Sequence, residues 1–71
     1  MNKQLIMKAV KIAIEFNEKY PQHCAAVHVD KYNVFWCISL NWNGEVYGGG
    51  KSAFAKSDAG IQEFIDYAAS I

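Results

Sequence analysis

Residues 34–47 of this chain read VFWCISLNWNGEVY, and this stretch decides the fold. The run that ends at Trp42 is rich in β-branched and aromatic residues and has no helical period, so it predicts a strand. Asn43-Gly44 follows directly. Asn-Gly is the strongest short signal for a β-hairpin, because both positions tolerate the positive φ of a type I′ turn. We therefore expect another strand to begin at Glu45.

The preceding strand is predicted from residues 25–32, which a Tyr32-Asn33 break separates from the VFWCISLNW run. A two-residue loop there would pair Val27 with Ile38, and a four-residue loop would keep the same parity. The two-residue loop also pairs His28 with Cys37 and Asp30 with Phe35 on the other side of the sheet. The predicted core side carries Val27, Val29, Trp36, Ile38, Leu40 and Trp42.

Three glycines, Gly48 to Gly50, interrupt the strand that is expected after the turn. Such a run is too flexible for a regular central strand, so it predicts a bend or a bulge. We expect the strand to resume from Ser52 to Ala55.

Both ends of the chain have a helical pattern. Between Asn2 and Tyr20 the apolar residues recur at steps of three and four, and Pro21 ends the helix because a proline pushes the residue before it out of the α region. A second helix is predicted from Ser57 or Asp58 to about Ser70. The two apolar stripes consist of Leu5, Ala9, Ile12, Phe16 and Tyr20, and of Ile61, Phe64, Ile65 and Ala68.

These elements predict an α+β fold of order α-β-β-β-α, a three-stranded antiparallel meander with two helices packed on one face. With 71 residues, the chain is expected to form a single domain over residues 1–71. Placing both helices on one face leaves the other face of the sheet open to solvent or to a partner.

The charges balance, with seven lysines, no arginine and seven acidic residues. Nucleic-acid binders usually carry a basic excess and use Arg for bidentate contacts, so the composition disfavours that class. No run approaches the length of a membrane span and no signal peptide is visible, so the expected location is the cytoplasm of the source or host cell. Cys24 and Cys37 fit this compartment as free thiols.

Three motifs invite a chemical interpretation, and each fails. Residues 48–52 read GGGKS, but the first glycine of a phosphate-binding P-loop would fall at Glu45. His28, Cys37 and Asp30 could form a nucleophile, base and carboxylate set, but nothing in the sequence depresses the cysteine pKa or provides an oxyanion site. Cys24 and His28 lie too far apart on a strand to share a metal ion. We therefore expect no enzymatic activity, cofactor or metal.

Two surfaces remain as candidate binding sites, both for a protein partner. The open sheet face is predicted to carry His28, Asp30, Tyr32 and Phe35. Trp42 and Tyr47 are expected near the Asn-Gly turn. The flank of the first helix carries Met7, Val10 and Ile14, which widen its apolar stripe beyond what one sheet contact needs. Either the second helix covers this flank, or a partner or second subunit does. Four further aromatic residues are assigned to the core: Phe16, Trp36, Phe54 and Phe64.

The order α-β-β-β-α in about 70 residues, together with GGGKSAFAK at 48–56, resembles the double-stranded RNA-binding domain. That family carries a lysine-rich stretch at the start of its last helix. Lys51 and Lys56 stand in for two of its lysines, whereas Ala53 and Phe54 stand where further basic residues would be. The resemblance implies contacts with duplex RNA phosphates through these two lysines, with Tyr32 or Phe35 beside them.

The sequence therefore favours a small non-enzymatic protein-interaction module. A regulator or inhibitor of the kind encoded by phages or mobile elements fits that description. We further expect a weak homodimer through Met7, Val10 and Ile14. Nucleic-acid binding through Lys51 and Lys56 is the alternative.

Overall fold

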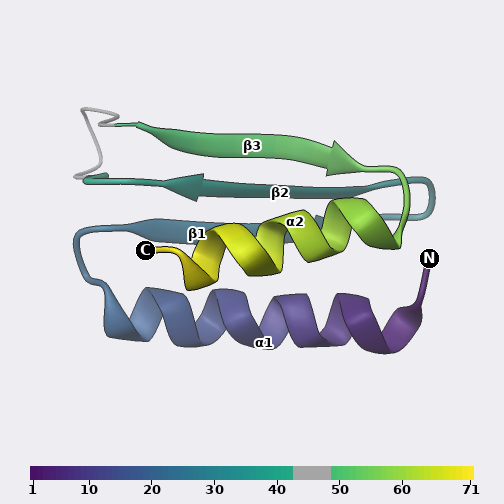
Figure 1. Ribbon diagram of the computed structural model, residues 1–71, viewed down its shortest axis with the longest axis horizontal. Coiled ribbons are helices and arrows are strands. Elements are labelled where there is room, and N and C mark those ends of the chain that lie inside the picture. The colour runs from purple at the N-terminus through teal and green to yellow at the C-terminus, as the bar shows by residue number, and fades with distance from the viewer. Residues whose placement is uncertain (43–48) are drawn as a thin grey trace.

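The structure is a computed structural model that describes residues 1–42 and 49–71. It has the predicted order of elements, with three antiparallel strands between two helices (Figure 1). The elements are α1 (Lys3–Lys19), β1 (Cys24–Val29), β2 (Val34–Ser39), β3 (Gly50–Ala55) and α2 (Asp58–Ala69). The α+β meander is therefore confirmed.

The sheet has the strand order β1-β2-β3, so β2 is central. Val29 pairs with Val34, which leaves a loop of four residues rather than two. Asp30 closes this loop, because its carboxylate accepts the backbone N–H groups of Tyr32 at 2.8 Å and Asn33 at 2.7 Å. The prediction of which β1 and β2 residues share a face of the sheet is right. The two-residue loop is wrong, and so is the pairing of His28 with Cys37 that follows from it.

The second strand is shorter than predicted and ends at Ser39 instead of Trp42. Leu40 still donates its N–H to the carbonyl of Gly49 at 2.7 Å. Asn41 then has a φ of 55°, which takes the chain out of the extended conformation. The Asn43-Gly44 hairpin and a strand beginning at Glu45 lie outside the described residues.

The third strand includes the predicted segment from Ser52 to Ala55 and begins at Gly50. Gly49 and Gly50 have φ angles of 139° and 130°, which only glycine adopts without strain. The chain therefore bends into β3 where the glycine run predicts a bend.

Local signals set the ends of both helices. The side chain of Asn2 accepts the N–H groups of Gln4 and Leu5, which caps the first turn of α1. Lys19 ends this helix just before Pro21, and α2 runs from Asp58 to Ala69 as the periodicity predicts.

Both helices pack on the same face of the sheet, α1 along β1 and α2 across β2 and β3 (Figure 1). Trp36 is at the centre of this core, 1% exposed, and donates its indole N–H to the carbonyl of Gly60 at 3.2 Å. The buried core consists of Ala9, Ala13, Phe16, Ala25, Val34, Trp36, Ile38, Ala55, Ile61, Phe64, Ile65 and Ala68.

The assignment of Phe54 to the core is wrong. Phe54 pairs with Phe35 across β2 and β3, and both point to the face that the helices leave uncovered. Its side chain is consequently 59% exposed.

Candidate functional site

The sheet face opposite the helices presents nine residues, three from each strand. Side chains alternate along a strand, and buried Val34, Trp36 and Ile38 mark the core side of β2, so the residues between them point outward. Cross-strand pairing then arranges the nine residues in three rows. The aromatic row is His28, Phe35 and Phe54, the middle row is Ala26, Cys37 and Ser52, and the small row is Cys24, Ser39 and Gly50. We call these nine residues the open sheet face.

None of the nine residues of the open sheet face is Lys, Arg, Asp or Glu. The charged residues of the described chain lie instead on the helices, in the loops, and at Lys51 on the helix side of β3. Lys51 forms an ion pair with Glu63 of α2, which places its ammonium group on the covered side of the sheet. The fold therefore separates a charged helical layer from a sheet face that has no Lys, Arg, Asp or Glu.

Two phenylalanines form the most prominent contact on this face. The rings of Phe35 and Phe54 are 5.0 Å apart between centroids, at an interplanar angle of 55°, a favourable tilted arrangement. His28 is the Cα partner of Phe35 on the other side, so a row of three rings crosses the sheet at the end nearest the β1–β2 loop.

Of the four residues predicted to share this face, His28 and Phe35 do so and are direct cross-strand partners. Asp30 and Tyr32 lie in the β1–β2 loop, beyond the end of the strand, because that loop has four residues. Tyr32 is 80% exposed there. His28 Nε2 lies 3.5 Å from Asp30 Oδ2, so the loop carboxylate borders the aromatic row.

The carboxylate of Asp30 has a structural role in the loop. Hydrogen bonds from the backbone N–H groups of Tyr32 and Asn33 lower the pKa of Asp30, and the nearby His28 contributes less. A carboxylate held ionised in this way is a poor proton donor or acceptor near neutral pH.

The two cysteines are free thiols on the open sheet face, Cys24 in the small row and Cys37 in the middle row. Burial raises the pKa of Cys37, and the neighbouring Cys24 raises it further. A nucleophilic cysteine needs the opposite shift, because the thiolate is the reactive form. The pairing also separates the proposed nucleophile and base, since Cys37 pairs with Ala26 and His28 pairs with Phe35.

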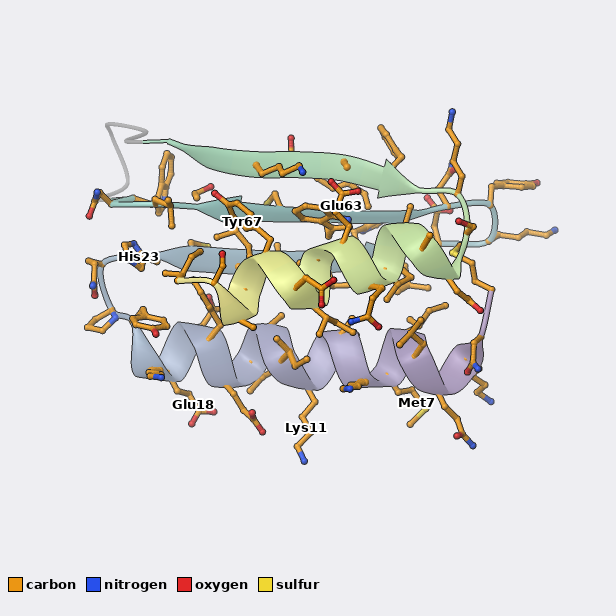
Figure 2. All side chains as sticks on the ribbon, viewed as in Figure 1. Met7, Lys11, Glu18, His23, Glu63 and Tyr67 are labelled. Atoms are coloured by element: carbon orange, nitrogen blue, oxygen red, sulfur yellow. The ribbon has the colours of Figure 1, made fainter. Side chains whose placement is uncertain are left out.

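The helix flank formed by Met7, Val10 and Ile14 is exposed, with exposed fractions of 61%, 36% and 55%. The expectation that α2 covers it is wrong, because α2 lies along the opposite side of α1, next to Phe16. In Figure 2, Met7 points away from α2 and from the sheet, as do Lys11 and Glu18. These charged neighbours border the flank.

The residues of the nucleic-acid alternative do not share one surface. Lys51 is paired with Glu63 on the helix side, and Phe35 points to the opposite side of the sheet. Lys56 is exposed in the β3–α2 connection. Asp58 opens α2, and a carboxylate there competes with a phosphate for the positive end of the helix dipole.

Sequence reasoning missed several members of the open sheet face. It placed Phe54 in the core and gave no role to Ala26, Ser39 or Ser52, since small residues give no local sign of which face they occupy. It also missed His23, whose Nδ1 accepts the N–H of Asn41 at 2.9 Å and links the α1–β1 connection to the end of β2.

Among the described residues, no three or more His, Cys, Asp or Glu side chains gather closely enough to hold a metal ion. Within the same residues, neither helix has the length and apolar character needed to cross a membrane. Comparison with protein families, with curated proteins and with solved structures finds no match to this chain. The open sheet face is therefore the feature of this chain that bears most directly on its function.

Proposed function

We propose that this chain is a non-enzymatic protein-interaction module that binds its partner through the open sheet face. The observation that carries the proposal is the absence of charge from the nine residues of this face, combined with the exposed Phe54. A module of this size would act as a regulator or an inhibitor by occupying a surface of its target.

An antiparallel sheet with one face in water normally alternates apolar residues inside with polar residues outside. Here the outward positions include two phenylalanines, two cysteines and an alanine. The centre of a protein interface is depleted of charged residues and enriched in aromatic ones, and its binding energy concentrates in a few such residues. The composition of the open sheet face matches that of an interface centre.

The chemistry of the candidate nucleophile also supports a binding role. Since burial raises the pKa of Cys37, this thiol stays protonated near neutral pH. Protonated and partly buried, it contributes apolar contact surface instead of reactivity.

A matched pair of variants tests the proposal. Phe54→Glu places a charge on the open sheet face, and Met7→Glu places the same charge on α1, where the exposure is almost equal at 61% against 59%. Each tagged variant and the wild type are used for capture from the source cell with quantitative mass spectrometry. We expect a partner that wild type and Met7→Glu retain and that Phe54→Glu loses.

A second readout shows where the partner sits. Cys37 lies in the middle row, so a protein bound to the open sheet face must slow its labelling by a maleimide. A partner that survives Phe54→Glu, or that leaves the labelling rate of Cys37 unchanged, binds elsewhere and contradicts the proposal.

Nucleic-acid binding through Lys51 and Lys56 is the alternative proposal. Phosphate contacts release counterions, so such binding must weaken steeply as salt increases. A salt titration against duplex RNA, with Lys56→Glu as the variant, separates the two. Salt-sensitive binding that Lys56→Glu reduces and Phe54→Glu leaves unchanged would favour the alternative.

A further inference from the structure

We infer that the partner of the open sheet face is a second copy of this chain, packed face to face with its strands aligned. This inference rests on the proposed function and identifies the occupant of the same surface. Three properties of the face carry it: the distribution of side-chain volume, the distribution of charge, and the size of the face.

Side-chain volume falls sharply along the strands beyond the aromatic row. The aromatic row at one end has three rings, from His28, Phe35 and Phe54. The small row at the other end consists of Cys24, Ser39 and Gly50. The middle row is nearly as small, because it differs only in having an alanine where the small row has a glycine. Among the described residues, the face is therefore raised at the aromatic row and lower at the other two rows.

Consider a two-fold axis that lies in the interface and runs along the middle row, perpendicular to the strands. This axis places the raised end of one copy over the low end of the other. Each strand then faces its own copy in the reverse direction, so the aromatic row of one copy lies over the small row of the other. Phe54 falls over the partner copy's glycine in β3, and Phe35 over its serine in β2. Two sheets packed in this way keep their strands within about 30° of each other, as in β-sandwiches.

The small row is held small by the backbone at Gly50. A Cβ atom at this position would lie 1.9 Å from the carbonyl oxygen of Ile38, so no larger residue fits without moving β2. The absence of a side chain at this end of β3, opposite the ring of Phe54 in the partner copy, is therefore required by the fold itself.

The distribution of charge also allows the open sheet face to bind a copy of itself. In an isologous contact every residue meets a copy of the same surface, and like charges placed opposite each other oppose binding. A face with no Lys, Arg, Asp or Glu meets its own copy without repulsion between such side chains. On the helix flank, in contrast, Lys11 and Glu15 border the apolar residues and form an ion pair within one chain at 3.9 Å.

The size of the face limits the strength of the dimer. Three strands about 4.8 Å apart and six residues long, at about 3.3 Å per residue, cover roughly 14 by 20 Å. Two such surfaces bury less than the ~1,200 Å² at which stable interfaces begin. We therefore expect a transient dimer that forms as concentration rises.

The first experiment measures mass as a function of concentration by sedimentation equilibrium. The weight-average mass of the wild type should rise from 8.0 kDa toward twice that value. Phe54→Glu should abolish the rise and Met7→Glu should leave it unchanged, with circular dichroism confirming that both variants fold. A wild type that stays at 8.0 kDa up to high micromolar concentration overturns the inference. It is also overturned if Met7→Glu, and not Phe54→Glu, abolishes the rise, since the helix flank would then be the interface.

The second experiment tests the register. The two-fold axis brings Ala26 of one copy opposite the same residue of the other, and Ala26 is exposed. Ala26→Lys and Ala26→Glu should each remain monomeric because like charges meet, and mixing the two should restore association. If each variant is monomeric and the mixture stays monomeric, the aligned arrangement is wrong.

A chemical cross-link provides an independent check. The same axis places Ser52, on the edge strand β3, opposite its own copy, so a short bis-maleimide should join two chains of a Cys24→Ser, Cys37→Ser, Ser52→Cys variant at the rim of the interface. The Phe54→Glu substitution should remove this product. A cross-linked dimer that persists in that variant would contradict the inference.

These results separate the inference from the proposed function. A monomeric wild type that still loses a captured protein on Phe54→Glu retains the interaction module and rejects the second copy as its partner. A monomeric wild type whose captured proteins are all indifferent to Phe54→Glu rejects both.

Discussion

Asn17 of α1 forms two hydrogen bonds with the backbone of Ala25 in β1. Its amide oxygen accepts the N–H of Ala25 at 2.6 Å, and its amide nitrogen donates to the carbonyl of Ala25 at 2.9 Å. Both backbone groups point away from β2, at the edge of the sheet. Edge strands expose unpaired groups of this kind, and one side chain here occupies them.

Replacing Asn17 should therefore weaken the attachment of α1 to the sheet. Asn17→Ala removes both bonds, each worth about 1 kcal/mol, and recovers about 0.5 kcal/mol from the better helix propensity of alanine. The expected loss in the free energy of unfolding is about 1–2 kcal/mol, measured by urea denaturation.

Two controls accompany this variant. Asn17→Asp keeps an acceptor for the N–H of Ala25 and loses the donor, so it should fall between wild type and Asn17→Ala. Glu18→Ala changes the exposed neighbouring position and should have little effect. Equal stability of Asn17→Ala and wild type would show that water replaces the side chain at the edge without loss.

Gly50 and Gly49 provide a matched pair for backbone strain and steric overlap. Both have positive φ angles, so an alanine at either costs about 1–3 kcal/mol in strain. Only at Gly50 would the added Cβ strike the carbonyl oxygen of Ile38. At Gly49, no described atom lies within 4 Å of the added carbon.

Gly50→Ala should therefore reduce the denaturation midpoint more than Gly49→Ala, and the difference measures the overlap with β2. Circular dichroism monitors secondary structure in both. If Gly49→Ala is the more damaging variant, the close contact between β3 and β2 is not as described.

The lowered pKa of Asp30 predicts that the folded protein loses stability in acid. Hydrogen bonds from Tyr32 and Asn33 lower its pKa in the folded state, so the unfolded chain binds the proton more tightly. The stabilisation is therefore present above the ordinary aspartate pKa of about 4 and is lost as pH falls through the lower folded value.

Asp30→Asn retains an acceptor oxygen but cannot titrate. Melting temperatures measured from neutral pH down to strongly acidic pH should decline less steeply for this variant than for wild type. Parallel profiles would mean that other carboxylates account for acid unfolding. The Asp58→Asn variant, at the start of α2, serves as the comparison.

The raised pKa of Cys37 predicts that this thiol is alkylated slowly at neutral pH. Burial and, to a smaller degree, Cys24 raise its pKa, so the thiolate fraction is low and the rate with iodoacetamide should keep increasing into the alkaline range. Because Cys24 contributes to the shift, Cys24→Ser should move the rate profile of Cys37 to lower pH. The measurement follows carbamidomethylation by mass spectrometry, and an unmoved profile would assign the shift to burial alone.

The sequence by itself determined the type and order of the elements. Helical periodicity, the end of α1 before Pro21 and the stripe of α2 from Ile61 to Ala68 are local properties, so neighbouring residues suffice to predict them. The parity of β1 and β2 was equally predictable, because alternation along a single strand marks which residues face the core.

Only the tertiary structure determined which residues lie on each exposed surface. The loop closed by Asp30 has four residues instead of two, and this shift pairs His28 with Phe35 and moves Tyr32 off the sheet. Phe54 points to the open sheet face because it pairs with Phe35 of β2, which is remote in sequence. The exposure of Met7 depends on which side of α1 the second helix takes.

These features share one physical reason. Strand register and helix docking minimise a free energy summed over residues that lie far apart in the chain, whereas periodicity reports only on neighbours. The sequence therefore predicts that one sheet face stays open. Which nine residues occupy that face, and that none of them is charged, follows only from the pairing of the three strands.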